Sequence, residues 1–242
     1  MSALFQVKDL KVSLSGTPIV RGVSFEAAGG AWFGVLGANG SGKTTLLRAL
    51  NGRVEIDAGS VRLDGQEMAN DLQALAGKIG FAPPPDSLPG ELTGGELIDL
   101  LSAARNAALR EPRAIFEALN IEWLEPLRLG QMSAGMRQRV CLFTAFIGAP
   151  AVILLDEPFN WLDPVAAFDL KLALRAWTDA GGVLVTALHG IADFATRCDH
   201  GVLLHDGQIV RAFGPDEIAK GRGDILAFEQ LVYEAFKDSA AA

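Results

Sequence analysis

The chain has 242 residues, a formal net charge of −8 and a 50% share of hydrophobic residues. This length suits one large α/β domain or a core with a small inserted subdomain, and it excludes a large multidomain machine. The excess of acidic over basic residues argues against a broad electrostatic grip on nucleic acid, so we expect no nucleic-acid partner.

No segment predicts membrane crossing or secretion. The longest apolar stretch, Val140–Leu155, is interrupted by Pro150, and a membrane span needs about 18 to 20 uninterrupted apolar residues. The first residues lack the basic-then-apolar order of a secretory signal. Cys141 and Cys198 lie far apart in apolar surroundings, which favours reduced core thiols over a disulfide. We therefore expect a soluble cytoplasmic chain.

In chain order, short β-rich runs alternate with helix-like stretches, which is typical of a mostly parallel α/β sheet. Strands are expected at 32–36, 78–82, 151–155 and 183–187. The run Ala151–Leu155 is apolar throughout rather than alternating, as in a central strand that is covered on both faces. We expect this strand to lie deep in the core.

Between residues 87 and 130 the strand pattern gives way to a helical one. Leu97, Leu100 and Leu101 have the spacing of one helical face. Thr93 and Glu96 form the pattern of a capping box, in which each side chain caps the other's backbone N–H. This region is interpreted as an inserted helical subdomain.

The end of the chain predicts one further element. Residues 225–236 have the pattern of an amphipathic helix, followed by a Ser-Ala-Ala-Ala end. No internal repeat or low-complexity linker interrupts the chain.

A phosphate-binding loop follows the strand at 32–36. Gly37–Thr44 reads G-x-x-x-x-G-K-T between a strand and a helix, the context in which this pattern binds polyphosphate. Its glycines allow several N–H groups to face one anion, and the helix N-terminus adds a favourable dipole. Lys43 is expected to neutralise the terminal phosphates and Thr44 to bind Mg²⁺. The predicted nucleotide-binding residues are Gly37, Ala38, Asn39, Gly40, Ser41, Gly42, Lys43, Thr44 and Thr45. The alternative is a glycine-rich turn that fits the pattern by chance.

Two carboxylates follow the buried strand at 151–155. Asp156 and Glu157 are expected at the carboxyl edge of the sheet, where α/β proteins bind ligands. Asp156 is predicted to hold Mg²⁺ through water, and Glu157 to polarise the water that attacks the γ-phosphate. Alone, either acid is more simply a helix cap or a solvated loop charge.

Three more segments complete an ordered set: Met132–Arg139 with the sequence MSAGMRQR, Asn160–Asp163 with NWLD, and His189 at the end of a strand. Together with the phosphate loop and the two carboxylates, they resemble the nucleotide-binding subunit of ATP-binding cassette (ABC) transporters over residues 4–213. The resemblance implies a P-loop NTPase core with a mostly parallel sheet, an antiparallel β subdomain near the N-terminus and an inserted helical subdomain. The implied division is a core of 1–86 and 151–213, a helical subdomain of about 87–150 and a helical tail of 214–242.

The resemblance also assigns roles to residues outside the phosphate loop. Ser133 and Gly135 would bind the γ-phosphate of an ATP held by a second protomer, and Ser133 is a good N-cap for the helix that follows. His189 would contact the γ-phosphate and position the water, with Asp163 in a loop that crosses the dimer interface. In isolation, Ser133 could simply start a helix and His189 could be a core histidine.

A metal site formed by Cys198, His200 and His205 is a further alternative, because these residue types are good ligands. On a strand, Cys198 and His200 would share one face while His205 would point to the other. This arrangement makes the metal site improbable.

The sequence departs from the family at three places. The position that usually stacks an aromatic ring on adenine aligns with Leu14, which predicts weaker base contact and relaxed base selectivity. The usual Mg²⁺-binding glutamine aligns with Pro84, which offers no side-chain ligand. Asp86 is a candidate replacement ligand for Mg²⁺, with a solvated loop acid as its simpler interpretation. Met132 and Ala134 replace the commoner Leu and Gly, which is a mild change.

The leading functional hypothesis is an ATP-hydrolysing motor subunit that dimerises on ATP with a second cassette and drives separate integral membrane permease subunits. Its implied cofactors are ATP and Mg²⁺, and its implied location is the cytoplasmic face of the membrane. Alternatives are a slowly hydrolysing cassette beside a competent partner and a soluble ABC ATPase outside transport. The stretch Leu155–Pro164 and the short tail after the cassette resemble exporter cassettes, so export is expected.

Overall fold

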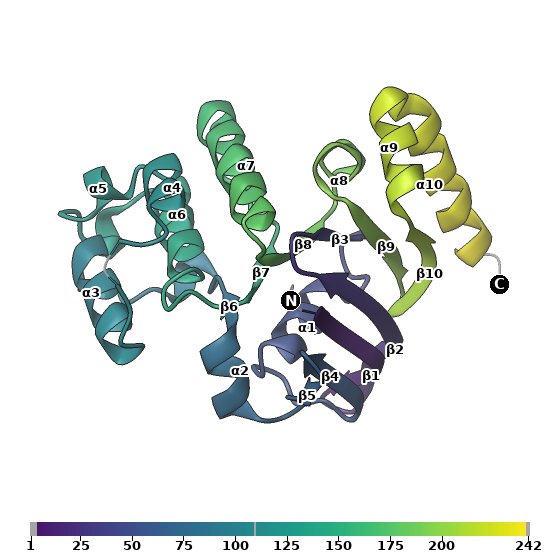
Figure 1. The fold of residues 1–242 in the computed structure, drawn as a ribbon, viewed down its shortest axis with the longest axis horizontal. Helices are drawn as coiled ribbons and strands as arrows, with labels where there is room; N and C mark the ends of the chain where they lie inside the picture. Colours follow the sequence, from purple (N-terminus) through teal and green to yellow (C-terminus); the bar gives the residue numbers. More distant parts are fainter. Residues whose placement is uncertain (1–3, 109, 241–242) are drawn as a thin grey trace.

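The computed structural model describes residues 4–108 and 110–240, which form two β-sheets with helices around them (Figure 1). The strands are β1 (Leu4–Leu14), β2 (Thr17–Ala28), β3 (Trp32–Leu36), β4 (Ala58–Leu63), β5 (Gln66–Glu67), β6 (Ile79–Phe81), β7 (Val152–Asp156), β8 (Val183–Leu188), β9 (His200–His205) and β10 (Gln208–Phe213). The α-helices are α1 (Lys43–Leu50), α2 (Leu72–Lys78), α3 (Gly94–Ala104), α4 (Arg113–Ala118), α5 (Ile121–Leu124), α6 (Ala134–Thr144), α7 (Pro164–Asp179), α8 (Ile191–Arg197), α9 (Pro215–Gly223) and α10 (Ile225–Ala240). Short 3₁₀ turns occur at η1 (Pro85–Ser87) and η2 (Leu129–Gln131).

The larger sheet has the order β10-β9-β3-β8-β7-β6 in the described part of the chain. All its neighbouring strands are parallel except β9 and β10, which form an antiparallel pair. This confirms the predicted mostly parallel α/β sheet, and β3 has the predicted bounds. Strand β7 begins and ends one residue later than expected, and its first four residues are buried, as predicted for a central strand.

Residues of this sheet alternate between two separate apolar cores. Trp32 and Leu36 pack into a core with the helices α3 to α10, whereas Phe33 and Val35 pack into a core with α1 and the smaller sheet. The alternation is the period of two that a strand imposes on its side chains. Both faces of the larger sheet are therefore covered, which explains why its central strands are largely apolar instead of alternating with polar residues.

The smaller sheet is antiparallel and has the order β2-β1-β4-β5. It confirms the antiparallel β region near the N-terminus. Strands β1 and β2 form a hairpin whose turn holds Ser15 and Gly16 at positive φ angles of 48° and 80°. Leu14 therefore lies at the tip of this hairpin, where it is 41% exposed.

Between β6 and β7 the described residues form helices and turns, and they lie together at the left of Figure 1. Both hydrogen bonds of the predicted capping box are present at the start of α3. The predicted helical face is wrong for Leu100, which is 58% exposed. The buried face of α3 runs through Leu97 and Ile98 instead, and Leu100 lies on the opposite flank of Leu97. The division into subdomains stays a prediction.

The amphipathic helix expected at 225–236 is α10, which extends to Ala240. Phe228 and Val232 are buried, whereas Leu226 and Tyr233 are exposed, so the predicted amphipathic character is confirmed. Phe228 packs against a ring from α8 and one from β10, with centroids 6.2 and 5.3 Å apart. These contacts fix the helix on the core.

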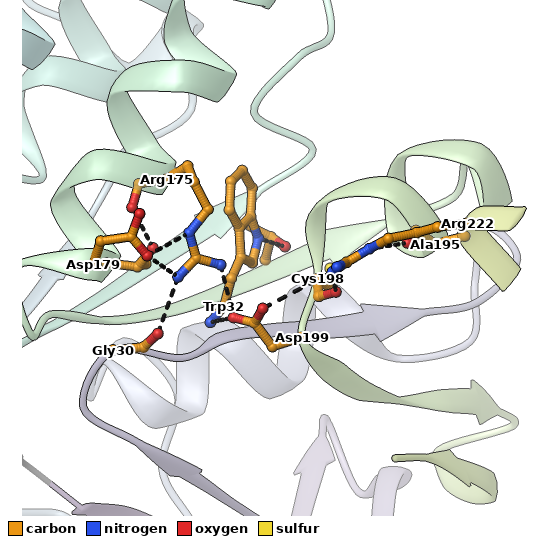
Figure 2. A network of polar contacts seen from close by, with 10 residues as sticks. Gly30, Trp32, Arg175, Asp179, Ala195, Cys198, Asp199 and Arg222 are labelled. Atoms are coloured by element: carbon orange, nitrogen blue, oxygen red, sulfur yellow. Dashed lines mark hydrogen bonds and ion pairs between the residues drawn. The ribbon is translucent and has the colours of Figure 1, made fainter. Parts of the chain in front are cut away.

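A polar network holds the amino end of β3 to the surrounding helices (Figure 2). The Asp199 carboxylate accepts hydrogen bonds from the backbone N–H of Trp32 and from Arg175, each at 2.8 Å. Arg175 also donates to the carbonyl of Gly30 at 3.0 Å, and Arg222 of α9 donates to the carbonyl of Cys198 at 2.6 Å. The network thus anchors α7 and α9 at the base of the sheet.

Cys141 and Cys198 are buried free thiols, as expected. Burial raises the pKa of Cys141 to about 12 and also raises the pKa of Cys198. Across residues 4–108 and 110–240, no helix combines the length and the apolar character that crossing a bilayer would require.

Candidate nucleotide site

The carboxyl ends of β3, β7 and β8 meet at one edge of the parallel sheet. Gly37 donates its backbone N–H to the Leu188 carbonyl at 3.3 Å, and Glu157 donates its N–H to the Ala187 carbonyl at 3.1 Å. The sheet register therefore brings together three loops that are more than thirty residues apart in the sequence. Ligands of open α/β sheets bind outside the carboxyl ends of parallel strands, so this edge is the expected place for a site.

The loop between β3 and α1 needs its glycines. Gly40 and Gly42 have φ angles of 84° and 104°, a region that glycine adopts without a steric penalty. A Cβ on Gly37 would lie 2.5 Å from the carbonyl oxygen of Leu204. The backbone therefore follows a path that larger residues would block or strain.

No side chain caps the N-terminus of α1, unlike the N-termini of α3, α6 and α7. The first N–H groups of a helix have no partner within the helix, and together with the helix dipole they favour an anion. Lys43, the first residue of α1, is 5% exposed and donates to the carbonyls of Gly37 and Ala38 at 2.7 and 3.1 Å. Burial lowers the pKa of Lys43, while Glu157 and Asp156 oppose that shift.

A carboxylate and a hydroxyl lie next to this helix start. Thr44 Oγ1 donates to Asp156 Oδ2 at 2.6 Å. The other Asp156 oxygen is buried and has no partner among the described residues, and the same holds for the Ser41 hydroxyl. Hydroxyl and carboxylate oxygens are ligands that Mg²⁺ prefers, and an unsatisfied buried oxygen costs free energy until it gains a partner. These residues therefore fit the predicted metal.

Glu157 and His189 are in contact. Glu157 Oε2 lies 2.6 Å from His189 Nδ1, and Glu157 Oε1 lies 3.9 Å from Lys43 Nζ. The backbone of Glu157 has a left-handed φ of 48°, which is uncommon for a residue other than glycine. This turn directs the carboxylate back toward the phosphate loop instead of along the strand.

A cavity of about 590 Å³ opens beside the loop. It contains six of the nine predicted loop residues and both carboxylates, so the structure brings these segments together. The lining residues are Ile19, Asn39, Gly40, Gly42, Lys43, Thr44, Thr45, Arg48, Phe81, Ala82, Pro83, Pro84, Pro85, Gln138, Asp156, Glu157, Asn160 and Trp161.

Ser133, Gly135 and Asp86 are not among the residues that line this cavity. Ser133 is the N-cap of α6, and its hydroxyl accepts from the backbone N–H of Met136 at 3.3 Å. Asp86 is 92% exposed and pairs with Arg137 at 3.4 Å. His189 is also outside this lining and reaches the site through its contact with Glu157. The roles of Ser133 and Gly135 at a second protomer's nucleotide and of Asp86 as a metal ligand stay predictions.

The alternative metal set does not converge. Cys198 ends α8 rather than lying on β9, and His200 packs edge-on against Phe33 with centroids 5.1 Å apart. His205 packs against Phe236 with centroids 4.4 Å apart. In the described part of the chain, no cluster of three His, Cys, Asp or Glu side chains has the geometry to hold a metal.

Several residues that line the cavity were not predicted as site residues, Ile19 and Trp161 among them. Ile19 of β2 lies along the cavity where the sequence alignment would place Leu14, because the hairpin turn carries Leu14 to its tip. Trp161 is 71% exposed, has a φ of 67°, and its carbonyl oxygen lies against Gly135. An aromatic residue inside the NWLD segment is the signal that could have found Trp161, whereas nothing in the sequence marks Ile19.

The site has the parts of a P-loop nucleotide-binding protein. They are a glycine-rich loop, a helix start without a side-chain cap, a buried lysine, and a threonine–carboxylate pair at the edge of a parallel sheet. The sequence model described as "ABC transporter" matches residues 20–160. The chain therefore belongs to the ABC transporter family, and it is an ATP-binding subunit of the kind that this family uses.

Curated relatives support this assignment over almost the whole chain. The chain is 31% identical to the ABC-type transporter ATP-binding protein EcsA of Bacillus subtilis, covering 98% of each sequence. It is 29% identical to the Nod factor export ATP-binding protein I of Paraburkholderia xenovorans, covering 90% of this chain and 79% of that protein.

Solved structures agree with the fold. An ATP-binding subunit of an ABC transporter superposes with a TM-score of 0.84 and 26% identity, covering 96% of this chain and 99% of that one. A dimeric ATP-binding cassette in a post-hydrolysis state with ADP and Pi has a TM-score of 0.75 and 23% identity, covering 87% of this chain and 98% of that one. The second likeness supports the fold alone.

Proposed function

We propose that this chain is the ATP-hydrolysing motor subunit of an ABC transporter, which dimerises on ATP with a second cassette and drives a separate integral membrane permease. The observation that carries the proposal is the Glu157–His189 pair, at 2.6 Å, beside a phosphate loop whose lysine is 3.9 Å from the same carboxylate. A nucleotide-binding loop alone would need neither group.

The site residues divide the work of hydrolysis. The loop N–H groups and Lys43 bind the β- and γ-phosphates, and Thr44 with Asp156 would hold Mg²⁺. When bound, Mg²⁺ supplies positive charge that offsets the charge of the phosphates. Glu157 accepts a proton from the attacking water as its oxygen bonds to the γ-phosphorus, and the bond to the ADP oxygen breaks. His189 holds the Glu157 carboxylate and the γ-phosphate in position.

The position of the signature segment, Met132–Arg139, supports a dimeric unit. Ser133 and Gly135 do not line the cavity of their own chain, which supports a role for them at the nucleotide of a second protomer. Ser133 starts an eleven-residue helix whose positive end would face the phosphate.

Export and location follow as further parts of the proposal. One relative is named as an export ATP-binding protein, which supports export rather than import. Docking to a permease would place the chain at the cytoplasmic face of the membrane. Cargo selection would lie with the permease, because the cavity described here is built for phosphates.

A slowly hydrolysing cassette beside a competent partner is a second candidate. Pro83, Pro84 and Pro85 line the cavity where a side-chain ligand is usual, and proline supplies none. The intact Glu157–His189 pair opposes this candidate. The turnover of the purified chain alone distinguishes the two, because only the leading proposal gives sustained hydrolysis without a second type of cassette.

The direct test compares wild type with Glu157→Gln in ATP hydrolysis and in particle mass by light scattering. We expect wild type to hydrolyse ATP, and Glu157→Gln to lose at least about a hundredfold in rate while forming an ATP-dependent dimer. Glu117→Gln is the matched control, because Glu117 on α4 is 61% exposed and lies outside the cavity. Full activity in Glu157→Gln, or no dimer with ATP, would contradict the proposal.

A further inference from the structure

Lys171 of α7 lies between the two segments that carry Glu157 and His189. Its ammonium nitrogen is 2.5 Å from Asp193 Oδ1 and 4.6 Å from the ring centroid of Phe159. The Lys171 side chain is only 16% exposed. A partly buried ammonium ion with two partners is held more firmly than a surface lysine, and both contacts are favourable.

The two partners of Lys171 follow the two proposed catalytic residues closely in the chain. Phe159 comes two residues after Glu157, and Asp193 is in the first turn of α8, four residues after His189. Glu157 and His189 touch at 2.6 Å on one side, and Phe159, Lys171 and Asp193 connect the same segments on the other. Two short backbone segments, 157–159 and 189–193, are thus linked to each other by side-chain contacts on both sides.

Each of the two segments that Lys171 joins has one locally unfavourable feature. Glu157 has a left-handed backbone, and Gly190, which begins α8, gives it no side-chain cap. Residues in sparsely populated backbone conformations keep them only where the surroundings impose them. An additional contact from α7 is therefore of use at this place.

Helix α7 is itself anchored. Arg175, four residues after Lys171, bonds to Asp199, Asp179 and the Gly30 carbonyl at the base of the sheet (Figure 2). In Figure 1, α7 and α8 stand beside each other above the strands β7 and β8. Lys171 therefore reaches Phe159 and Asp193 from a fixed support.

We propose that Lys171 is a positioning residue that keeps Glu157 and His189 in register for hydrolysis, an inference that rests on the proposed function. Lys171 does not line the cavity, and its contacts with Asp193 and Phe159 lie outside the phosphate loop. We call the contacts of Lys171 with Phe159 and Asp193 the brace. Loss of the brace therefore lowers the rate of the chemical step and leaves ATP binding unchanged.

The kinetic test uses Lys171→Met, Asp193→Asn, the double variant and Lys171→Arg. We expect kcat to fall about tenfold in each of the first three with KM for ATP unchanged within about twofold, because a small misplacement of a catalytic group is costly. The double variant should lose no more than either single one, since both break the same contact. Lys171→Arg keeps the charge and the ring contact and should recover most of kcat.

Arg105→Met distinguishes positioning from general stability, because Arg105 at the end of α3 donates to the Ile147 carbonyl at 2.6 Å and does not line the cavity. It also removes a partly buried cation and its hydrogen bond, so we expect a comparable loss in melting temperature, with kcat within about threefold of wild type. If kcat instead follows melting temperature across both variants, or if KM rises with kcat unchanged, Lys171 is structural and the proposal is wrong.

Amide hydrogen exchange without nucleotide tests the brace independently of activity. Lys171→Met should speed exchange in 157–163 and 188–197, whereas Arg113→Met, which breaks the exposed Arg113–Glu117 pair, should not. Unchanged exchange in both segments would overturn the brace. Absence of hydrolysis by wild type would overturn the proposed function, and the exchange result would still decide on the brace.

Discussion

At the scale of single residues, the start of α6 and the loop before α7 are fitted against each other without spare room. A Cβ on Gly135 would lie 2.5 Å from the carbonyl oxygen of Trp161. Asp163, two residues further on, caps α7 and pairs with Arg139 of α6 at 2.5 Å, and the backbone hydrogen bond from Ala166 lowers its pKa. A substitution at Gly135 or Asp163 would therefore shift Trp161, which lines the cavity.

Gly135→Ala is predicted to destabilise the chain by about 1–3 kcal/mol, because the added methyl group must displace backbone atoms. The rate of ATP hydrolysis should also fall, by more than the loss of folded protein alone would cause, since Trp161 lines the cavity. Gly77→Ala in α2 is the control, because a Cβ there meets no atom within 4 Å, and it should stabilise by about 0.5–1 kcal/mol. Urea unfolding measures both. Equal stability of the two variants would contradict the packing described here.

The buried thiols make stability depend on pH. In the folded chain the pKa of Cys141 is raised to about 12 from 9.0, so above pH 9 the unfolded thiol ionises while the folded thiol stays protonated. The free energy of unfolding should therefore fall with rising pH, by up to about 1.4 kcal/mol per pH unit for this thiol. Urea unfolding between pH 8 and pH 10 should show a shallower fall for Cys141→Ala than for wild type. An identical slope would contradict the assigned burial.

At the scale of elements, the capping box of α3 gives a prediction away from the site. Thr93→Ala removes the acceptor for the Glu96 N–H and should lower stability by about 1 kcal/mol. ATP affinity should stay within about twofold of wild type, because α3 does not line the cavity. Thr93→Ser, which keeps the hydroxyl, should recover most of the loss. A change in affinity that exceeds the change in stability would show that α3 supports the site directly.

Elements with a strong period could be predicted from the sequence, and those set by tertiary contacts could not. The strand at 32–36 and the cap at Thr93 depend on neighbouring residues alone. The prediction that Leu100 is buried is wrong, because three leucines indicate the period of a helix but not which side of it meets the core. The tertiary surroundings decide that choice.

The candidate site divides in the same way. The phosphate loop, Asp156 and Glu157 are contiguous motifs, so the residues could be listed from the sequence. Their contacts could not: the Glu157–His189 pair spans 32 residues and depends on the register of β7 against β8. Ile19 enters the cavity because the β1–β2 hairpin places it there, and the motifs of the site do not show which hairpin residue comes to lie beside them.

At the scale of the whole molecule, the central claim is that a complete hydrolytic site needs two chains. In the proposal, one chain would supply the cavity with Lys43, and its partner would supply Ser133 and Gly135, which lie outside that cavity. In a symmetric dimer each of the two sites would then combine halves from both protomers. Variants that disable opposite halves should therefore complement each other.

The decisive measurement mixes Lys43→Ala with Ser133→Arg and follows ATP hydrolysis. Each variant alone should remain near background, because every dimer it forms has two defective sites. The mixture should recover up to about a quarter of the wild-type rate, because half of the dimers are mixed and each of those has one intact site of two. A mixture no more active than the sum of its parts would contradict the two-chain site.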